Sequence, residues 1–287
     1  MQRNVESIIS LDQMLLSQAL SLDPPSARTE VQCLLQQVLM VERAYFYAHP
    51  ERILSETESV NYQALLQRRL AGEPIAYILG KREFFGLNFF VSPATLIPRP
   101  ETELLVELVL ARSDVNMNGM RILDLGTGSG AIALSLAHHL PKAEVWACDV
   151  SSKALTIARK NAEQLGISTV RFVESDWYEG LSNQCFNLIV SNPPYIEESD
   201  PHLSQGDLRF EPVNALAAGS DGLNDLRHIA LNASSHLENN GWLLMEHGYN
   251  QAEPVREILK QAGFNSVFSA KDISGIERCS GGFCQLS

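Results

Sequence analysis

The chain contains 287 residues, which is long enough for one large domain or for a main domain with a smaller one. Hydrophobic residues make up 45% and charged residues 20% of the sequence, as in an ordinary globular protein. The net charge of −12 argues against a protein that holds duplex nucleic acid by general attraction to its phosphates. The same charge is compatible with a local basic patch or with a protein substrate that has a basic surface.

No apolar stretch reaches the length of a membrane span, and the N-terminal segment MQRNVESIISLDQML lacks the basic start and apolar middle of a signal peptide. The five cysteines are an odd number, are widely scattered and include no C-x-x-C pair. We therefore expect reduced thiols, with neither disulfides nor a metal site. These features predict a cytoplasmic protein without a membrane partner.

The first 80 residues have a helical pattern. In TEVQCLLQQVLM, apolar residues recur on one stripe from Val31 to Leu39, after a helix-start signal at Pro24 and Pro25. A second helical segment, NYQALLQRRLAGEP, stops at Gly72. Helices joined by short polar turns predict a small N-terminal bundle over residues 1–80.

Residues 81–100 have a different character. In EFFGLNFFVSP, aromatic segments flank residues 86–88, which is typical of a β-hairpin. Pro98 and Pro100 then hold the backbone extended, so we expect a stiff linker. Glu101 and Glu103 follow in the first turn of a predicted helix, where the helix dipole favours carboxylates.

Strands and helices alternate through residues 101–287, which we assign to one domain. The predicted strands are RILDL, EVWACD, TVRFVES, FNLIV, GWLLMEH, NSVFSA and GFCQL. Helical segments such as SKALTIARKNAEQLG and AEPVREILKQAG lie between them. Apolar strands that alternate with amphipathic helices predict an α/β fold with an open, mostly parallel sheet covered on both faces.

The run ILDLGTGSGAIALSLA combines a strand, a glycine-rich turn and a helix. Gly126, Gly128 and Gly130 let the backbone turn sharply and approach a ligand, and the helix start offers free N–H groups. Asp149 ends the next strand, where a carboxylate can bind both hydroxyls of a ribose. These features predict a nucleoside cofactor. They do not exclude NAD, because Gly126, Gly128 and Ala131 also satisfy the pattern G-x-G-x-x-A.

A third pair of residues follows the next predicted strand, in FVESDWYEG. Asp176 can accept a hydrogen bond from the amino group of an adenine, and Trp177 can cover the ring. Alone, they are more typical of a turn aspartate and a packing tryptophan. Because they continue the series of polar residues at strand ends, we favour an adenosine site.

The hexapeptide SNPPYI follows the strand FNLIV, at the sheet edge where such folds bind ligands. Pro193 and Pro194 remove two N–H donors and fix the turn, so we expect their carbonyl oxygens to face outward. With the side-chain oxygen of Asn192, these carbonyls form a set of acceptors that suits a planar –NH2 group. Tyr195 offers a ring on which a flat amide or base can stack.

Such acceptors have a chemical consequence. The lone pair of an amide or exocyclic amine is delocalised, which makes the nitrogen a weak nucleophile. Hydrogen bonds from its two hydrogens to fixed oxygens raise its electron density and stabilise the positive charge that develops during alkyl transfer. The turn resembles the Asn/Asp-Pro-Pro-Tyr turn of methyltransferases that act on planar –NH2 groups, so we expect S-adenosylmethionine as the cofactor.

From about Leu70 to the C-terminus, the sequence resembles the HemK/PrmC family of protein-(glutamine-N5) methyltransferases, which modify the Gly-Gly-Gln glutamine of peptide chain release factors. The blocks that carry the resemblance are GEPIAYILGKREFFGLNFFV, LIPRPETELLVE, DLGTGSGAIALSLA, SNPPYIEESDPHL, DLRFEPVNALAAGSDGL and MEHGYNQ. The resemblance implies a class I S-adenosylmethionine-dependent methyltransferase with a Rossmann-like, mostly parallel seven-stranded sheet. It also implies that the helical domain recognises the substrate, a class 1 release factor, and we expect a monomer.

The resemblance also implies roles for individual residues. Those expected to bind S-adenosylmethionine, and its product S-adenosylhomocysteine, are Arg99, Glu101, Gly126, Thr127, Gly128, Ser129, Gly130, Asp149, Asp176, Trp177 and Asn192. Those expected to act on the glutamine are Asn192, Pro193, Pro194 and Tyr195, with Phe89 and Phe90 of the hairpin lining its pocket. The RFEP block, which contains Glu211, is expected to organise the loop after the turn. His247 is expected to be a hydrogen-bonded structural residue.

Three alternatives remain open at the level of sequence. An adenine-N6 methyltransferase acting on DNA or RNA would use the same turn, but it would need a basic face and a target-recognition domain. An NAD(P)-dependent oxidoreductase would leave NPPY unexplained. A non-enzymatic binding module would have no need for an amide-holding turn beside a cofactor.

Overall fold

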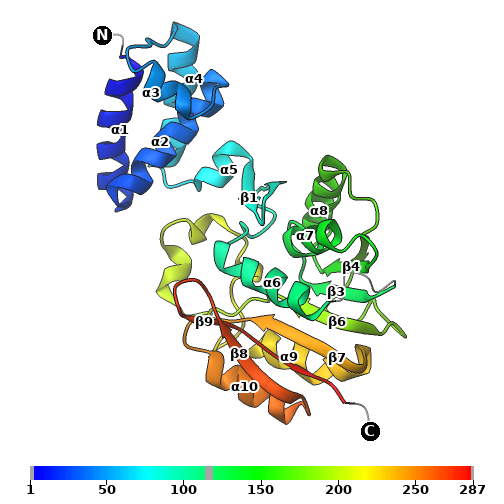
Figure 1. Ribbon diagram of the computed structural model, residues 1–287. Coiled ribbons are helices and arrows are strands. Elements are labelled where there is room, and N and C mark those ends of the chain that lie inside the picture. The colour runs from blue at the N-terminus through cyan, green and yellow to red at the C-terminus, as the bar shows by residue number, and fades with distance from the viewer. Residues whose placement is uncertain (1–2, 114–118, 286–287) are drawn as a thin grey trace. The chain divides into compact units, whose positions relative to one another are not determined.

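The structure is a computed structural model that describes residues 3–113 and 119–285. These residues form two compact units (Figure 1). The first unit contains residues 3–81 and Ser204–Phe210, and the second contains the rest. Within the described ranges, no helix is long and apolar enough to cross a membrane.

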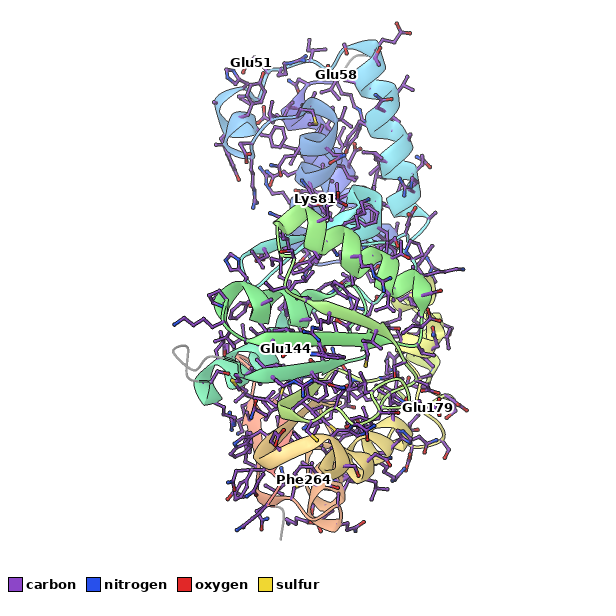
Figure 2. All side chains as sticks on the ribbon, turned by 90° about the vertical axis from the view of Figure 1, so that its right-hand side faces the viewer. Glu51, Glu58, Lys81, Glu144, Glu179 and Phe264 are labelled. Atoms are coloured by element: carbon purple, nitrogen blue, oxygen red, sulfur yellow. The ribbon has the colours of Figure 1, made fainter. Side chains whose placement is uncertain are left out.

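The first unit is helical, as predicted. Its α-helices are α1 (Val5–Leu20), α2 (Pro24–Leu39), α3 (Ala44–Ala48), α4 (Glu56–Leu70) and α5 (Ile75–Leu79). The side chains of Asn4 and Asp23 cap α1 and α2 by accepting backbone N–H groups. Ser55 and Glu58 form a reciprocal capping box at the start of α4, and Glu58 is labelled in Figure 2.

A buried arginine joins these helices to the segment Ser204–Phe210. The side chain of Arg69 is 3% exposed, and its Nε lies 2.7 Å from Glu30 Oε2 while its Nη1 lies 3.0 Å from Asp207 Oδ1. Nη1 also donates to the carbonyl oxygens of Gly72 and Glu73. This network satisfies a charge that would otherwise be costly to bury.

We expect Glu30→Ala to lower the free energy of unfolding of the first unit by roughly 2 kcal/mol, because it leaves Arg69 with one carboxylate in place of two. Glu51→Ala is the matched control, since Glu51 is 75% exposed and lies 3.9 Å from the His49 ring. Chemical denaturation followed by circular dichroism measures both variants. Equal stabilities would contradict the structural role of the Arg69 network.

The second unit begins with the predicted hairpin. Strands β1 (Lys81–Phe84) and β2 (Leu87–Phe90) are joined by Phe85 and Gly86, whose φ angles are 50° and 77°. The turn therefore precedes the position expected from the sequence. A two-residue turn with both φ angles positive matches the twist of paired strands, and glycine adopts such a φ without strain.

A seven-stranded sheet follows, in the order β5-β4-β3-β6-β7-β9-β8. Its strands are β3 (Arg121–Leu125), β4 (Glu144–Asp149), β5 (Arg171–Glu174), β6 (Phe186–Ser191), β7 (Leu237–Glu246), β8 (Asn265–Lys271) and β9 (Glu277–Phe283). Neighbouring strands from β5 to β7 are parallel, and β9 is antiparallel to both β7 and β8. The predicted mostly parallel α/β sheet is confirmed.

Helices cover both faces of this sheet, and side chains fill the space between the layers (Figure 2). One face packs against α6 (Glu103–Arg112), α7 (Ala131–His139) and α8 (Ser152–Leu165), and the other against α9 (Asn224–Ala233) and α10 (Ala252–Gln261). Ile122 belongs to the first core and Leu123 to the second, as the alternation of side chains along a strand requires. Short 3-10 helices include η1 (Pro100–Thr102) and η4 (Val213–Ala215).

The last strand differs from the prediction. The sequence favoured a strand over residues 282–286, but β9 runs from Glu277 to Phe283, and Leu286 lies outside the described residues. The sequence did not predict a strand that runs through Gly281 and Gly282, because glycine is unfavourable in strands. In the structure, close packing requires glycine at this position, since a Cβ at Gly281 would lie 2.5 Å from Leu244 Cδ2.

Strand register places four loops at one level of the sheet. Leu125 pairs with Cys148 and Ser191, and Ser191 pairs with Met245. The residues that directly follow this row are Gly126, Asp149, Asn192 and Glu246. The chain order of the strands reverses between β3 and β6, which is where open α/β sheets bind ligands.

Candidate active site

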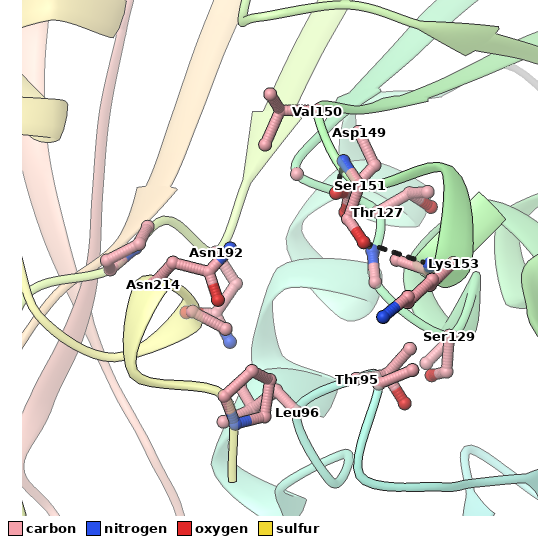
Figure 3. Close-up of a pocket in the computed structure, with 18 of the residues that line it drawn as sticks. Thr95, Leu96, Thr127, Ser129, Asp149, Val150, Ser151, Lys153, Asn192 and Asn214 are labelled. Carbon is pink, nitrogen blue, oxygen red and sulfur yellow. Dashed lines mark hydrogen bonds between the residues drawn. The ribbon is translucent and has the colours of Figure 1, made fainter.

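A cavity of about 530 Å³ lies at this reversal point, within the second unit. Figure 3 shows Asp149, Ser151 and Lys153 on one side of it, and Asn192 and Asn214 on the other. Of the residues predicted from the sequence, those that line the cavity are Arg99, Gly126, Thr127, Gly128, Ser129, Asp149, Asp176, Trp177, Asn192 and Pro194. The fold therefore brings together motifs that are far apart in the chain.

A buried carboxylate holds the glycine-rich loop. Asp124, in β3, is fully buried, and its Oδ2 accepts hydrogen bonds from Thr127 Oγ1 at 2.7 Å and from the Ala133 N–H at 3.1 Å. Burial raises the pKa of Asp124 to about 7, and these two hydrogen bonds oppose the rise. Sequence reasoning did not assign Asp124 a role. The feature of the sequence that could have identified it is a carboxylate within the otherwise apolar strand RILDL.

Gly130 packs two helices together and does not line the cavity. A Cβ at this position would lie 3.0 Å from Leu134 Cδ1 and 3.2 Å from Ala158 Cβ, so α7 can start close to α8 only with glycine here. The φ angle of Gly130 is +82°, which also favours glycine. Gly130 therefore has a packing role, and its predicted contact with the cofactor stays a prediction.

Asp149 is fixed at the cavity edge by the backbone. Its Oδ2 accepts the Gly128 N–H at 2.9 Å, and its Oδ1 accepts the Ser151 N–H at 2.8 Å. Burial raises the pKa of Asp149, and these two hydrogen bonds lower it. Each carboxylate oxygen retains a lone pair, so the side chain can still accept hydrogen bonds from a ribose.

Trp177 lies against the glycine-rich loop. Its ring is 3.5 Å from the position that a Cβ of Gly126 would take. Asp225, in the first turn of α9, is a cavity residue that the sequence analysis missed. Burial raises the pKa of Asp225, whereas the charge of His228 lowers it. Asp225 and Trp177 both line the cavity, and the neighbouring Asp176 is exposed.

Some residues of the NPPY turn face the cavity, and others face the core. Asn192 and Pro194 line the cavity, and Asn192 Nδ2 donates to Thr102 Oγ1 at 3.1 Å. Among the described residues, no protein donor bonds to the carbonyl oxygens of Pro193 and Pro194. Tyr195 does not line the cavity: its ring packs against the core and its hydroxyl lies 3.2 Å from Glu246 Oε1. The expected stacking surface therefore faces the interior.

Phe89 and Phe90 are not among the cavity-lining residues. Phe89 is fully buried and packs edge to face with Phe84. The ring of Phe90 faces the Lys160 ammonium, with 3.3 Å between Nζ and the ring centroid. In this structure both rings hold the hairpin and α8.

The PRPET block is anchored by the RFEP block. Arg99 lines the cavity and forms an ion pair with Glu211, which is 4% exposed. Glu211 Oε2 also accepts the Ile97 N–H at 3.0 Å, so one carboxylate holds the segment before α6. Glu211 therefore anchors a segment that precedes α6, whereas the sequence predicted that RFEP organises the loop after the NPPY turn. Glu101 is exposed and does not line the cavity.

His247 has the structural role that was expected. It is fully buried, with Nδ1 2.9 Å from the Gly248 carbonyl oxygen and Nε2 2.9 Å from Ser280 Oγ. Burial lowers the pKa of this imidazole, which favours its neutral form.

The sheet order, the glycine-rich loop and the carboxylate at the end of β4 define a class I S-adenosylmethionine-dependent methyltransferase. Residues 100–207 match the methyltransferase small domain family, and residues 14–80 match the PrmC N-terminal domain family. A crystal structure of a methyltransferase from Pyrococcus furiosus shares the fold, with a TM-score of 0.53 and 22% identity over 79% of this chain and 99% of that chain.

Relatives with higher sequence identity than this crystal structure identify the family. The release factor glutamine methyltransferase of Salmonella typhimurium is 50% identical over 256 residues, covering 89% of this chain and 92% of the relative. That of Escherichia coli is 47% identical over 253 residues, covering 88% and 91%. The chain therefore belongs to the release factor glutamine methyltransferase family, as its motifs indicated. The NAD(P)-dependent and non-enzymatic alternatives are excluded.

We expect Asp149→Ala to weaken cofactor binding by roughly 1.5–3 kcal/mol, the range for a lost charge-assisted hydrogen bond. Isothermal titration calorimetry with S-adenosylhomocysteine measures this loss. The control is Glu257→Ala, which removes an exposed carboxylate on α10 that pairs with Lys260 at the surface. Unchanged affinity in Asp149→Ala would show that the ribose assignment is wrong.

Proposed function

We propose that this protein transfers a methyl group from S-adenosylmethionine to the side-chain amide nitrogen (N5) of the glutamine in the Gly-Gly-Gln motif of peptide chain release factors. The observation that carries the proposal is the Asn192 side chain at the cavity edge, across from the glycine-rich loop and Asp149. Its –NH2 group is bonded to Thr102, so its oxygen is available to a ligand. Family membership supports the same reaction.

The cavity residues fit the cofactor. A volume of about 530 Å³ lies within the range of small-ligand pockets, and a Cβ at Gly128 would meet no atom within 4 Å, so the loop is open to a ligand there. We propose that Gly126–Ser129 contact the methionine part, Asp149 the ribose, and Trp177 with Asp176 the adenine. S-adenosylmethionine supplies an electrophilic methyl group on its sulfonium.

The residues of the turn act on the substrate nitrogen. The Asn192 oxygen and the Pro193 and Pro194 carbonyls accept the two amide hydrogens, which directs the nitrogen lone pair at the methyl carbon. A C–N bond forms as the S–C bond breaks, and S-adenosylhomocysteine leaves. Asn192 is neutral and is not a strong base, so the amide proton leaves after the C–N bond has formed.

The charge of the chain supports a protein substrate. A net charge of −12 disfavours duplex nucleic acid and suits a basic protein surface. We further propose that the first unit recognises the release factor outside its glutamine loop, and that the enzyme works as a monomer. Incubation with labelled cofactor and either release factor or adenine-containing oligonucleotide distinguishes this reaction from adenine-N6 methylation.

We expect Asn192→Ala to reduce methyl transfer at least roughly 10²-fold, the usual loss for one such donor or acceptor group at a reaction centre. Cofactor affinity should change little. Turnover is measured by mass spectrometry of the modified peptide, with Asn232→Ala, on the exposed surface of α9, as the matched control. A variant with wild-type turnover would rule out the proposed role of Asn192.

Removal of residues 1–75 should reduce activity on a whole release factor much more than activity on a short glutamine peptide. The truncated chain loses Arg69, which is the partner of Asp207. Activity on the peptide is therefore the control, because its retention shows that the catalytic unit remains folded. Equal losses on both substrates would reject a recognition role for the first unit.

A further inference from the structure

Asn214 is a cavity residue that has no part in the reaction described above. It lies in η4, and its neighbours Pro212 and Ala215 also line the cavity. Figure 3 shows Asn214 on the same side of the cavity as Asn192. Asn192 is half-buried, whereas Asn214 is exposed, so Asn214 lies nearer to the mouth of the cavity.

The turn that carries Asn214 is fixed to the NPPY turn by backbone hydrogen bonds. The Leu216 carbonyl oxygen accepts the N–H groups of Tyr195 at 3.2 Å and of Ile196 at 2.9 Å. The Ala218 N–H in turn donates to the Ile196 carbonyl oxygen at 2.9 Å. The backbone therefore holds the Asn214 turn against the end of NPPY.

A second anchor lies on the other side of the same turn. Glu211 precedes Asn214 by three residues, and its Oε2 accepts the Ile97 N–H at 3.0 Å. The same carboxylate forms the ion pair with Arg99. Because the turn is anchored before and after Asn214, a ligand that binds there has little backbone to order, which lowers the entropic cost of binding.

The side chain of Asn214 offers both a donor and an acceptor. Over residues 3–113 and 119–285, no protein group is hydrogen-bonded to its amide. An asparagine amide carries an acceptor oxygen and a donor –NH2 group in one plane. Asn192 differs, because one of its amide hydrogens is already bonded to Thr102. Asn214 therefore suits a ligand group that presents a donor and an acceptor side by side.

The carbonyl oxygen of the substrate glutamine is not a suitable ligand for Asn214. A hydrogen bond to that oxygen stabilises the delocalised form of the amide, in which the nitrogen lone pair is withdrawn toward the oxygen. The lone pair leaves this delocalised system as the C–N bond forms, so the bond would favour the ground state over the transition state. A residue at the mouth that assists the reaction should therefore bind another part of the substrate.

The main chain of an extended peptide has the required pair of groups. In an extended segment, the N–H and C=O groups of one residue point to the same side, as they do between antiparallel strands. Glycine lacks a side chain, so its backbone can approach a protein surface closely. The Gly-Gly-Gln motif places such a residue directly before the glutamine whose amide is held at Asn192.

We propose that Asn214 binds the main chain of the glycine that precedes the methylated glutamine. Its –NH2 group donates to the glycine carbonyl oxygen, and its oxygen accepts the glycine N–H. The inference rests on the proposed function and gives the site a residue that recognises the peptide next to the reacting side chain. Such a contact is the same in the ground state and the transition state, so it lowers KM without changing kcat.

The first test is Asn214→Ala in the full-length chain, with a purified release factor as substrate. KM should rise roughly tenfold, the loss expected for a pair of neutral hydrogen bonds. Both kcat and the Kd for S-adenosylhomocysteine should stay within about threefold, because neither the reacting nitrogen nor the cofactor loses a contact. The control is Val213→Ala on the same turn, since Val213 is 64% exposed and does not line the cavity.

Three results of the first test would overturn the inference. One is a wild-type KM in Asn214→Ala. Another is a loss that is confined to kcat, which would indicate a role at the reacting nitrogen. The third is an equal rise of KM in Val213→Ala, which would indicate a general effect on the turn.

The second test changes the substrate. In a synthetic Gly-Gly-Gln peptide, glycolic acid replaces the second glycine, so that its N–H group becomes an ester oxygen. Wild-type enzyme should have a higher KM for this ester than for the parent peptide, whereas Asn214→Ala should have the same KM for both. An ester that raises KM equally for both enzymes would contradict the proposed contact.

The wild-type enzyme separates this inference from the proposed function. If it methylates neither the release factor nor the parent peptide, the proposed function is wrong and the inference is wrong with it. If it is active and Asn214→Ala leaves KM unaffected, only the binding of the main chain by Asn214 is refuted.

Discussion

The parallel pairing of β3 with β6 is the constraint on which the site depends. Leu125 and Ser191 are in register, and the Ser191 hydroxyl donates to the Leu125 carbonyl oxygen at 2.8 Å inside the core. Because the two strands end at one level, the glycine-rich loop and the NPPY turn open into the same cavity. A shift of one residue would turn the side chains of the shifted strand to the opposite face. The register therefore fixes the glycine-rich loop and the NPPY turn relative to each other.

Two buried carboxylates support the two halves of this site. Asp124 holds the glycine-rich loop through Thr127 and the Ala133 N–H, and Glu246 accepts a hydrogen bond from Tyr195 of the NPPY turn. Burial raises the pKa of each to about 7. A buried carboxylate costs stability, but as an acceptor it gives direction to the hydroxyls around it. Both residues thus fix donors and acceptors where water is excluded.

The relatives and the geometry agree on the reaction, and the sequence motifs contribute different parts of the structure around the cavity. The PRPET block contributes Arg99 and Thr102 to the cavity, and Glu211 of the RFEP block holds it in place. The segment Ser204–Phe210, which follows NPPY in the chain and includes the first two residues of RFEP, packs with the helical unit through Asp207 and Arg69. The NPPY turn is therefore followed along the chain by a segment that belongs to the proposed recognition unit.

The sequence by itself determined the sheet class, the helical N-terminal unit and ten of the residues that line the cavity. It could do so because glycine loops, prolines and polar residues at strand ends act through local backbone geometry, which follows from adjacent residues. Gly126, Asp149 and Asn192 were all found in this way.

Only the tertiary structure decided which polar groups meet. Asn192 and Thr102 are 90 residues apart, and Tyr195 and Glu246 are 51 apart, so their contacts depend on strand register and on packing from other elements. The same holds where expectation and structure differ. Tyr195 turns inward to reach a buried carboxylate, Phe89 fills a core, and Gly130 allows two helices to approach, because each side chain is placed by neighbours that are remote in the sequence.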